Sequence, residues 1–152
     1  MGALYNHSAP SRLRTGPRRL VDPGMPITPS PLIEVRRTQG KGRGVFARAP
    51  ISQGTIIERA PVLVIPAVEV DENPYDTVIT RYCFQWGHDT VAVVLGYGSL
   101  YNHSYKPNAY YRDRRNRVKE FIALRNIAAG EEITINYNGS PHDPSDVGFE
   151  TR

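Results

Sequence analysis

The sequence predicts a mainly β domain with one small helical insert. The chain of 152 residues contains nine tyrosines and many short runs of valine and isoleucine, which are residue types enriched in strands. Gly, Asn, Pro or charged residues separate these runs at short intervals, as turns separate strands. A chain of this length has room for one domain with a substantial core, but not for a second catalytic domain.

Residues 1–31 predict a disordered basic tail. Six prolines interrupt the segment, and it lacks the apolar periodicity that could bury one face. Four arginines in it face one acidic residue, Asp22. Residues 32–139 are therefore expected to form the domain. Residues 140–152, rich in Pro and Asp, are expected to form a second tail.

Within the domain, the elements are expected in a fixed order. A strand at residues 32–36 is followed by a glycine turn at 40–44, a strand at 45–51, and a turn and strand at 51–58. A further strand at 62–65 and four later ones at 90–98, 108–113, 117–124 and 132–137 complete the β structure. Residues 71–84 are the one good helix candidate, with Asp71 as N-cap and Asn73-Pro74 in the first turn.

Composition excludes several classes of protein. No apolar stretch approaches the roughly 18 residues of a membrane span, and the N-terminus lacks the apolar core of a secretory signal. We therefore expect a soluble, cytoplasmic protein that does not contact membranes. Cys83 is the only cysteine, which excludes an intrachain disulfide and a Cys-rich zinc cluster, and no metal is expected. The net charge of +4 suggests an acidic partner.

A glycine pair near the start of the domain is the first candidate binding element. Gly42 and Gly44 flank Arg43, and the missing Cβ atoms would let the backbone approach a ligand closely. The alternative is a plain β-hairpin turn, and the pattern alone favours that turn.

A polar run between apolar strands is the second candidate. Asn102 and His103 precede Ser104 and a Pro-Asn pair, and such groups are costly to bury without partners. The alternative is a turn in which Asn and Ser cap their own backbone. A metal role for His103 is not supported, because no further ligands stand at suitable spacing.

The last predicted strand ends on the third candidate, Tyr137. Ile133 and Ile135 alternate with polar residues, and continued alternation would point Tyr137 inward with them. On this pattern alone, Tyr137 is expected to be a core residue whose hydroxyl has a partner.

Taken together and in this order, three motifs resemble those of the SET-domain family. They are "GKGRGVFA", "NHSYKPN" and "GEEITINY", and the resemblance covers residues 32 to about 139. Each motif alone is weak evidence, but the ordered triple is specific. The resemblance implies a β-clip fold and an enzyme that transfers a methyl group from S-adenosylmethionine to a lysine side chain of a protein or peptide.

The resemblance also implies roles for individual residues. Tyr137 matches the family's catalytic tyrosine, and Tyr111 matches a second tyrosine of the substrate channel. Tyr110 is the rival of Tyr111, since alternation points only one of them inward. The main chain of the glycine loop would lie along the methionine and ribose part of the cofactor, Asn102 would bind the methionine part, and His103 would bind adenine through its main chain. The loop positions are Lys41, Gly42, Arg43 and Gly44.

Two readings from other classes compete with this enzyme. One is a non-catalytic SET-like module that binds a basic peptide. The other is a basic nucleic-acid-binding domain, suggested by the arginine-rich N-terminal tail and by the arginines at 112, 114, 115 and 117. Asp113 interrupts that arginine run, so a solvated hairpin tip is preferred and a nucleic-acid partner is not expected.

The chain also lacks the Cys-rich flanks of many relatives, so another element must close the substrate channel. A C-terminal tail containing Phe149 could do so. A second subunit could do so as well, and that would give a homodimer.

Overall fold

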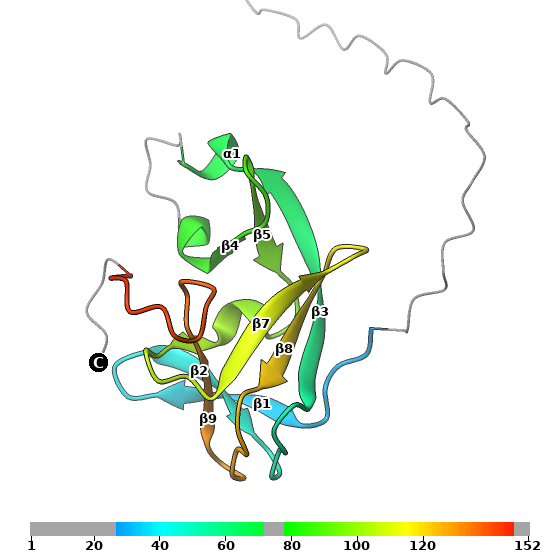
Figure 1. The fold of residues 1–152 in the computed structure, drawn as a ribbon, viewed down its shortest axis with the longest axis vertical. Coiled ribbons are helices and arrows are strands. Elements are labelled where there is room, and N and C mark those ends of the chain that lie inside the picture. Colours follow the sequence, from blue (N-terminus) through cyan, green and yellow to red (C-terminus); the bar gives the residue numbers. More distant parts are fainter. Residues whose placement is uncertain (1–26, 72–77, 148–152) are drawn as a thin grey trace, which may run out of the picture.

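The computed structural model describes residues 27–71 and 78–147, which form two β-sheets and a few short helical turns. Figure 1 shows one sheet beside the other. The predicted mainly β class is confirmed. Most of residues 1–31, the Asn73-Pro74 pair and Phe149 lie outside the described residues.

The four-stranded sheet brings distant parts of the chain together. Its order is β1 (Ile33–Thr38), β2 (Gly42–Ala47), β9 (Glu132–Ile135) and β6 (Asn102–His103). The first three strands pair antiparallel, whereas β6 runs parallel to β9. The last strand of the chain therefore lies between an early strand and a middle one, and the three sequence motifs become neighbours.

The second sheet has five antiparallel strands. Their order is β4 (Cys83–Gln85), β5 (Thr90–Val94), β3 (Ile56–Pro66), β8 (Val118–Ala123) and β7 (Ala109–Arg114). The sequence predicted two separate strands where the structure has the single long β3. This strand pairs with β8 up to Pro61 and with β5 from Val62 onward. Pro61 has no N–H for a ladder, and the Val62 N–H donates to the carbonyl of Arg117 (2.9 Å).

The predicted helix at residues 71–84 is only partly confirmed within the described residues, and Asp71 ends a helix instead of serving as an N-cap. A short helix α1 (Val68–Asp71) and a 3-10 helix η1 (Val78–Tyr82) lie around the segment, and Cys83 and Phe84 belong to strand β4. Phe84 pairs in register with Ala92 of β5, and its ring packs edge-on against Phe121. Pairing with β5 and packing against Phe121 therefore override the local helical signal at Cys83 and Phe84.

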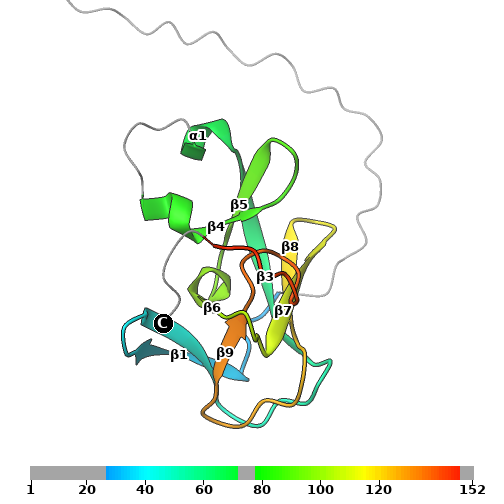
Figure 2. The ribbon, with the colours of Figure 1, turned by 60° about the vertical axis from the view of Figure 1, so that its left-hand side comes forward.

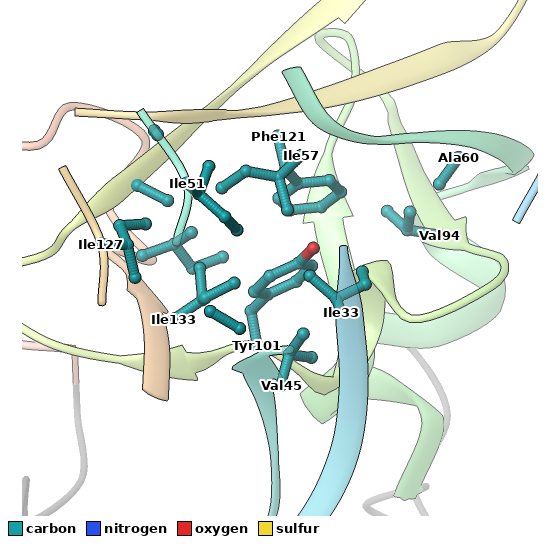
Figure 3. Packing of buried hydrophobic residues seen from close by; sticks show 14 of the residues in the cluster. Ile33, Val45, Ile51, Ile57, Ala60, Val94, Tyr101, Phe121, Ile127 and Ile133 are labelled. Carbon is teal, nitrogen blue, oxygen red and sulfur yellow. The ribbon is translucent and has the colours of Figure 1, made fainter. Parts of the chain in front are cut away.

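The core lies between the two sheets and includes Tyr101, which directly follows the short 3-10 helix η2 (Gly98–Leu100) (Figure 3). Val45 and Ile133 come from the four-stranded sheet, and Ile57 and Phe121 come from the five-stranded sheet. The Tyr101 ring stacks on that of Phe121 with 4.4 Å between centroids.

Two further findings concern residues 27–71 and 78–147. None of their helices is long or apolar enough to cross a membrane. They also contain no group of three or more metal-ligating side chains.

Candidate active site

The glycine loop is a hairpin turn that also packs tightly against other strands. Gly42 has a φ of +75°, which glycine adopts at little cost. A Cβ atom on Gly44 would clash with the Glu132 carboxylate and would lie 2.8 Å from the Asn102 amide nitrogen. The two readings from the sequence are therefore compatible, because the turn exists and its backbone approaches other groups closely.

Asn102 links the three motifs. Its side-chain amide donates to the carbonyl of Arg43 (3.0 Å) and to a carboxylate oxygen of Glu132 (2.6 Å). The polar run at Asn102 thus has the partners that its burial requires. Glu132 was not predicted as a site residue, because its position beside Asn102 depends on the parallel pairing of β6 with β9.

His103 supports Tyr137 through its side chain. The Tyr137 N–H donates to Nδ1 of His103 (3.2 Å), and the two rings meet edge to face with 5.2 Å between centroids. Burial, together with the nearby Lys41 charge, lowers the pKa of His103 below its ordinary 6.5. The imidazole is therefore neutral at pH 7, as an accepting Nδ1 requires. The resemblance implied only a main-chain role for His103.

Tyr137 does not point into the core as strand alternation predicted. Strand β9 ends at Ile135, so the alternation stops before Tyr137, and that residue is 39% exposed. Its hydroxyl is sheltered and donates to the carbonyl of Tyr101 (2.7 Å). Burial of the hydroxyl, with the nearby Tyr82 and Glu132, raises the pKa of Tyr137 to about 12. The hydroxyl is thus a proton-bearing donor at neutral pH.

Tyr111 packs inward against the aromatic core and supports the same residue. Its ring lies edge-on to Phe84, with 5.0 Å between centroids, and its hydroxyl donates to the Tyr137 carbonyl (3.3 Å). Burial, and secondarily the charge of Asp113, raises the pKa of Tyr111 to about 12. Alternation along β7 points Tyr110 to the opposite face of the sheet.

Two clefts meet at Tyr137. The first is open to solvent and has a volume of about 300 Å³, at the lower end of the range of small-molecule sites. The second lies beside η1 and β4. The two clefts share four lining residues: Tyr82, Ser99, Tyr101 and Tyr137. The first cleft is lined in addition by Lys41, Gly42, Arg43 and Leu100. The second is lined in addition by Arg81, Cys83, Phe84 and Gln85. A group could therefore pass between molecules bound in the two clefts.

Glu58, a buried carboxylate that was not predicted as a site residue, supports the place where the two clefts meet through its hydrogen bond with Tyr101. Glu58 is only 7% exposed and accepts hydrogen bonds from the Tyr101 hydroxyl (3.1 Å) and the Tyr97 N–H (2.9 Å). Burial raises the pKa of Glu58, although both hydrogen bonds oppose the shift. Glu58 thus fixes Tyr101, whose carbonyl accepts from Tyr137. An acidic residue within an apolar strand was the available signal.

A buried lysine, also missed, holds β4 against β7. The Lys119 ammonium lies 4.9 Å from the ring centre of Phe84, 4.6 Å from that of Tyr111 and 5.5 Å from that of Trp86. It also forms an ion pair with Asp113, and burial lowers its pKa despite that partner. These contacts fix an aromatic wall of the second cleft, since Phe84 lines it.

Comparison with known proteins identifies the class. The SET domain family matches residues 42–138. A curated protein of Schizosaccharomyces pombe, the histone-lysine N-methyltransferase specific for lysine 37 of H3, is 40% identical over 114 residues, covering 74% of this chain and 77% of its own. A crystal structure of a candidate histone methyltransferase from Plasmodium falciparum matches with a TM-score of 0.61 and 33% identity, covering 75% of this chain and 97% of its own. The chain belongs to the SET-domain family.

The resemblance seen in the sequence is thereby confirmed. The protein is an enzyme, a protein-lysine N-methyltransferase that takes its methyl group from S-adenosylmethionine. The reading as a non-catalytic binding module is set aside.

Proposed function

We propose that the substrate of this methyltransferase is a lysine of a histone. The curated relative from Schizosaccharomyces pombe acts on histone H3, and it shares 40% identity over 114 residues. The observation that supports transfer at this site is the pair of clefts that share Tyr82, Ser99, Tyr101 and Tyr137. Two bound molecules could meet there with their reacting atoms close together.

We assign the cofactor to the first cleft. Lys41, Gly42 and Arg43 of the glycine loop line this cleft, so the backbone of the loop can lie along a bound ligand there. Lys41 and Arg43 supply positive charge suited to the carboxylate of the methionine part. Asn102 and His103 line neither cleft. Asn102 adjoins the first cleft through its hydrogen bond to the Arg43 carbonyl, so we keep for it the role beside the methionine part that the resemblance implied. The role of the His103 main chain toward adenine rests on the resemblance alone. When bound, S-adenosylmethionine supplies a methyl group on a positively charged sulfur.

We assign the substrate lysine to the second cleft. A lysine amine must lose its proton before it can attack, which costs roughly 4.6 kcal/mol at pH 7 from a reference pKa of ~10.4. The rings of Tyr82 and Phe84 line this cleft and would exclude water from the ammonium. Desolvation disfavours the charged form, so the cleft itself lowers the pKa of the bound lysine.

Tyr137 is the proposed catalytic residue, because its hydroxyl lies where the clefts meet. With a pKa raised to about 12, it keeps its proton and positions groups instead of acting as a base. Tyr111 lines neither cleft and donates to the Tyr137 carbonyl, so we assign it a positioning role. This differs from the channel role that the resemblance implied for Tyr111.

The expected homodimer and the cytoplasmic location stay predictions. Val78, Ile79 and Tyr82 are exposed apolar residues of η1, and Tyr82 lines both clefts. A second subunit would find apolar surface to cover here, and sedimentation of the protein at several concentrations would test the homodimer.

The proposed substrate can be tested with recombinant histone octamers and labelled S-adenosylmethionine. Label is expected on one histone, at a lysine identified by mass spectrometry and lost when that lysine is replaced by arginine. Tyr137→Phe is the control for transfer at this site. Label absent from every histone but present on other lysate proteins would refute the histone substrate and leave the enzymatic activity intact.

A further inference from the structure

The outward face of the β3–β8–β7 part of the sheet carries an excess of positive charge. Arg59 and Arg112 each lie within 2.9 Å of the Glu120 carboxylate, and Arg114 lies 3.7 Å from it. The Glu120 side chain is only 5% exposed, whereas those of Arg112 and Arg114 are 47% and 56% exposed. One buried carboxylate therefore orders three guanidinium groups and neutralises only one of them.

Asp113 does not offset this charge, contrary to the interpretation from the sequence. Asp113 lies opposite Lys119 in the register of β7 with β8, and the two side chains form an ion pair. Alternation points Asp113 to the face of the sheet opposite to Arg112 and Arg114. Its charge is matched by Lys119, whose side chain is fully buried.

The turn between β7 and β8 adds two more arginines, Arg115 and Arg117, both exposed. Asn116 and Arg117 have φ values of 65° and 57°, a region that arginine seldom adopts. The Val62 N–H donates to the Arg117 carbonyl (2.9 Å), which helps to hold the turn in this shape. Neither arginine has an ion pair within the part of the chain that the structure describes. In Figures 1 and 2 the turn lies at the end of the hairpin away from β9.

We propose that this basic face binds the phosphate backbone of double-stranded DNA without reading its sequence. The basic face consists of Arg59, Arg112, Arg114, Arg115 and Arg117. Five arginines and one carboxylate leave four uncompensated positive charges, as many as the net charge of the whole chain. Guanidinium groups match phosphate oxygens in geometry, and neutralised phosphates release counterions, which drives binding.

Rigid placement favours a duplex over a single strand. Arg59, Arg112 and Arg114 stand on paired strands and are held by one buried carboxylate, so they present a fixed array to a regular backbone. Binding of single strands typically needs aromatic side chains on which the bases stack. DNA is also the polyanion that is wrapped around histones. The choice of DNA as the biological partner therefore rests on the proposed histone substrate, whereas the affinity of these arginines for DNA does not.

The basic face and the active site lie on opposite faces of the same sheet. Tyr111 of β7 points toward the site, and its neighbours Arg112 and Arg114 point the other way. DNA on the basic face would therefore leave both clefts open. Bound DNA should lower KM for histones assembled on DNA, but not for a free histone peptide.

The test is fluorescence anisotropy with labelled duplexes of about 20 base pairs in two unrelated sequences, measured at several salt concentrations. The test variant is Arg114→Ser/Arg115→Ser. The matched control is Arg37→Ser/Arg48→Ser, which removes the same charge from exposed positions elsewhere. The logarithm of affinity should fall with the logarithm of salt with a slope of about −4 for the native protein, since each phosphate contact contributes about −0.9.

The test variant should lose roughly tenfold in affinity at about 100 mM salt, and its slope should become shallower by about two. The control should stay within about twofold, and both variants should methylate a free histone peptide normally. Equal losses in both variants would assign binding to overall charge and overturn the proposal. No duplex binding by the native protein at about 50 mM salt, tighter binding to single strands, or preference for one duplex would overturn it as well.

The anisotropy measurements do not depend on methyl transfer. A protein that labels no histone but binds duplex DNA through these arginines would refute the proposed substrate and leave this inference standing.

Discussion

Replacing Tyr101 by phenylalanine isolates the buried contact beneath the active site. The change removes the hydroxyl that donates to Glu58 (3.1 Å) and keeps the ring that stacks on Phe121. Glu58 would retain only the Tyr97 N–H as a donor. A hydrogen bond to a charged group contributes about 1.5–3 kcal/mol, so we expect a loss of about 2 kcal/mol in unfolding free energy near pH 8. In a domain of this size the melting temperature should fall by about 10 °C.

The loss should depend on pH in a defined direction. Because burial raises the pKa of Glu58, the folded state holds this proton more tightly than the unfolded state does. The contribution of Glu58 to stability is thus fully present below its ordinary pKa of 4.5 and falls as pH rises through the raised pKa. Without the Tyr101 hydroxyl the pKa of Glu58 rises further, so Tyr101→Phe should cost less near pH 5 than near pH 8.

Urea unfolding at pH 5 and pH 8 measures the loss of unfolding free energy that Tyr101→Phe causes at each pH. Tyr110→Phe is the control, because Tyr110 lies on the face of β7 opposite to Tyr111. The control should lose less than about 0.5 kcal/mol, as expected for a change away from buried contacts. An equal cost of Tyr101→Phe at pH 5 and pH 8, or a cost no larger than that of the control, would refute the role assigned to the Glu58 contact.

Three further predictions concern the site and its support. Tyr137→Phe should lower single-turnover methyl transfer by two or more orders of magnitude and change cofactor affinity far less; equal rates would remove the hydroxyl from the mechanism. Gly44→Ala should abolish cofactor binding in calorimetry, because its Cβ would displace the Glu132 carboxylate and the Asn102 amide. Gly42→Ala should still bind the cofactor, because its Cβ meets open space and costs only about 1–2 kcal/mol of backbone strain. Similar cofactor binding by both variants would contradict this. The Arg125 guanidinium lowers the pKa of Glu131 to about 2, so the contribution of Glu131 to stability is present above pH 4.5 and is lost as pH falls toward 2. Glu131→Gln should flatten the acid branch of a stability profile, and an unchanged branch would exclude this pair as its source.

Local patterns predicted much of this molecule because short strands and glycine turns leave local signals. Ile133 and Ile135 are fully buried, as the alternation in the last strand indicated. Alternation failed for Tyr137 because β9 ends two residues earlier. The ordered motifs predicted which segments would meet, although not that Asn102 would join them through its side-chain amide.

Contacts across long stretches of sequence account for what could not be predicted. Phe84 of β4 packs against Phe121 of the distant strand β8, and no property of residues 83–84 themselves encodes that contact. Glu58 is satisfied by Tyr101, 43 residues further along the chain. The residues around Glu58 show an acid in an apolar strand, but they contain no information on the distant Tyr101 hydroxyl that donates to it.

The position of β9 between β2 and β6 constrains the order in which the chain can fold during its synthesis. A ribosome releases β2 and β6 before β9, and these two strands have no shared partner in their sheet until β9 is added. The hairpin of β7 and β8 joins neighbouring segments and can form while synthesis continues. Tyr137 lies two residues after the end of β9, so the two clefts cannot meet at Tyr137 before β9 has been synthesised. A truncated chain ending before Glu132 would contain the glycine loop and the Asn102-His103 pair, but without β9 these two motifs could not form the site.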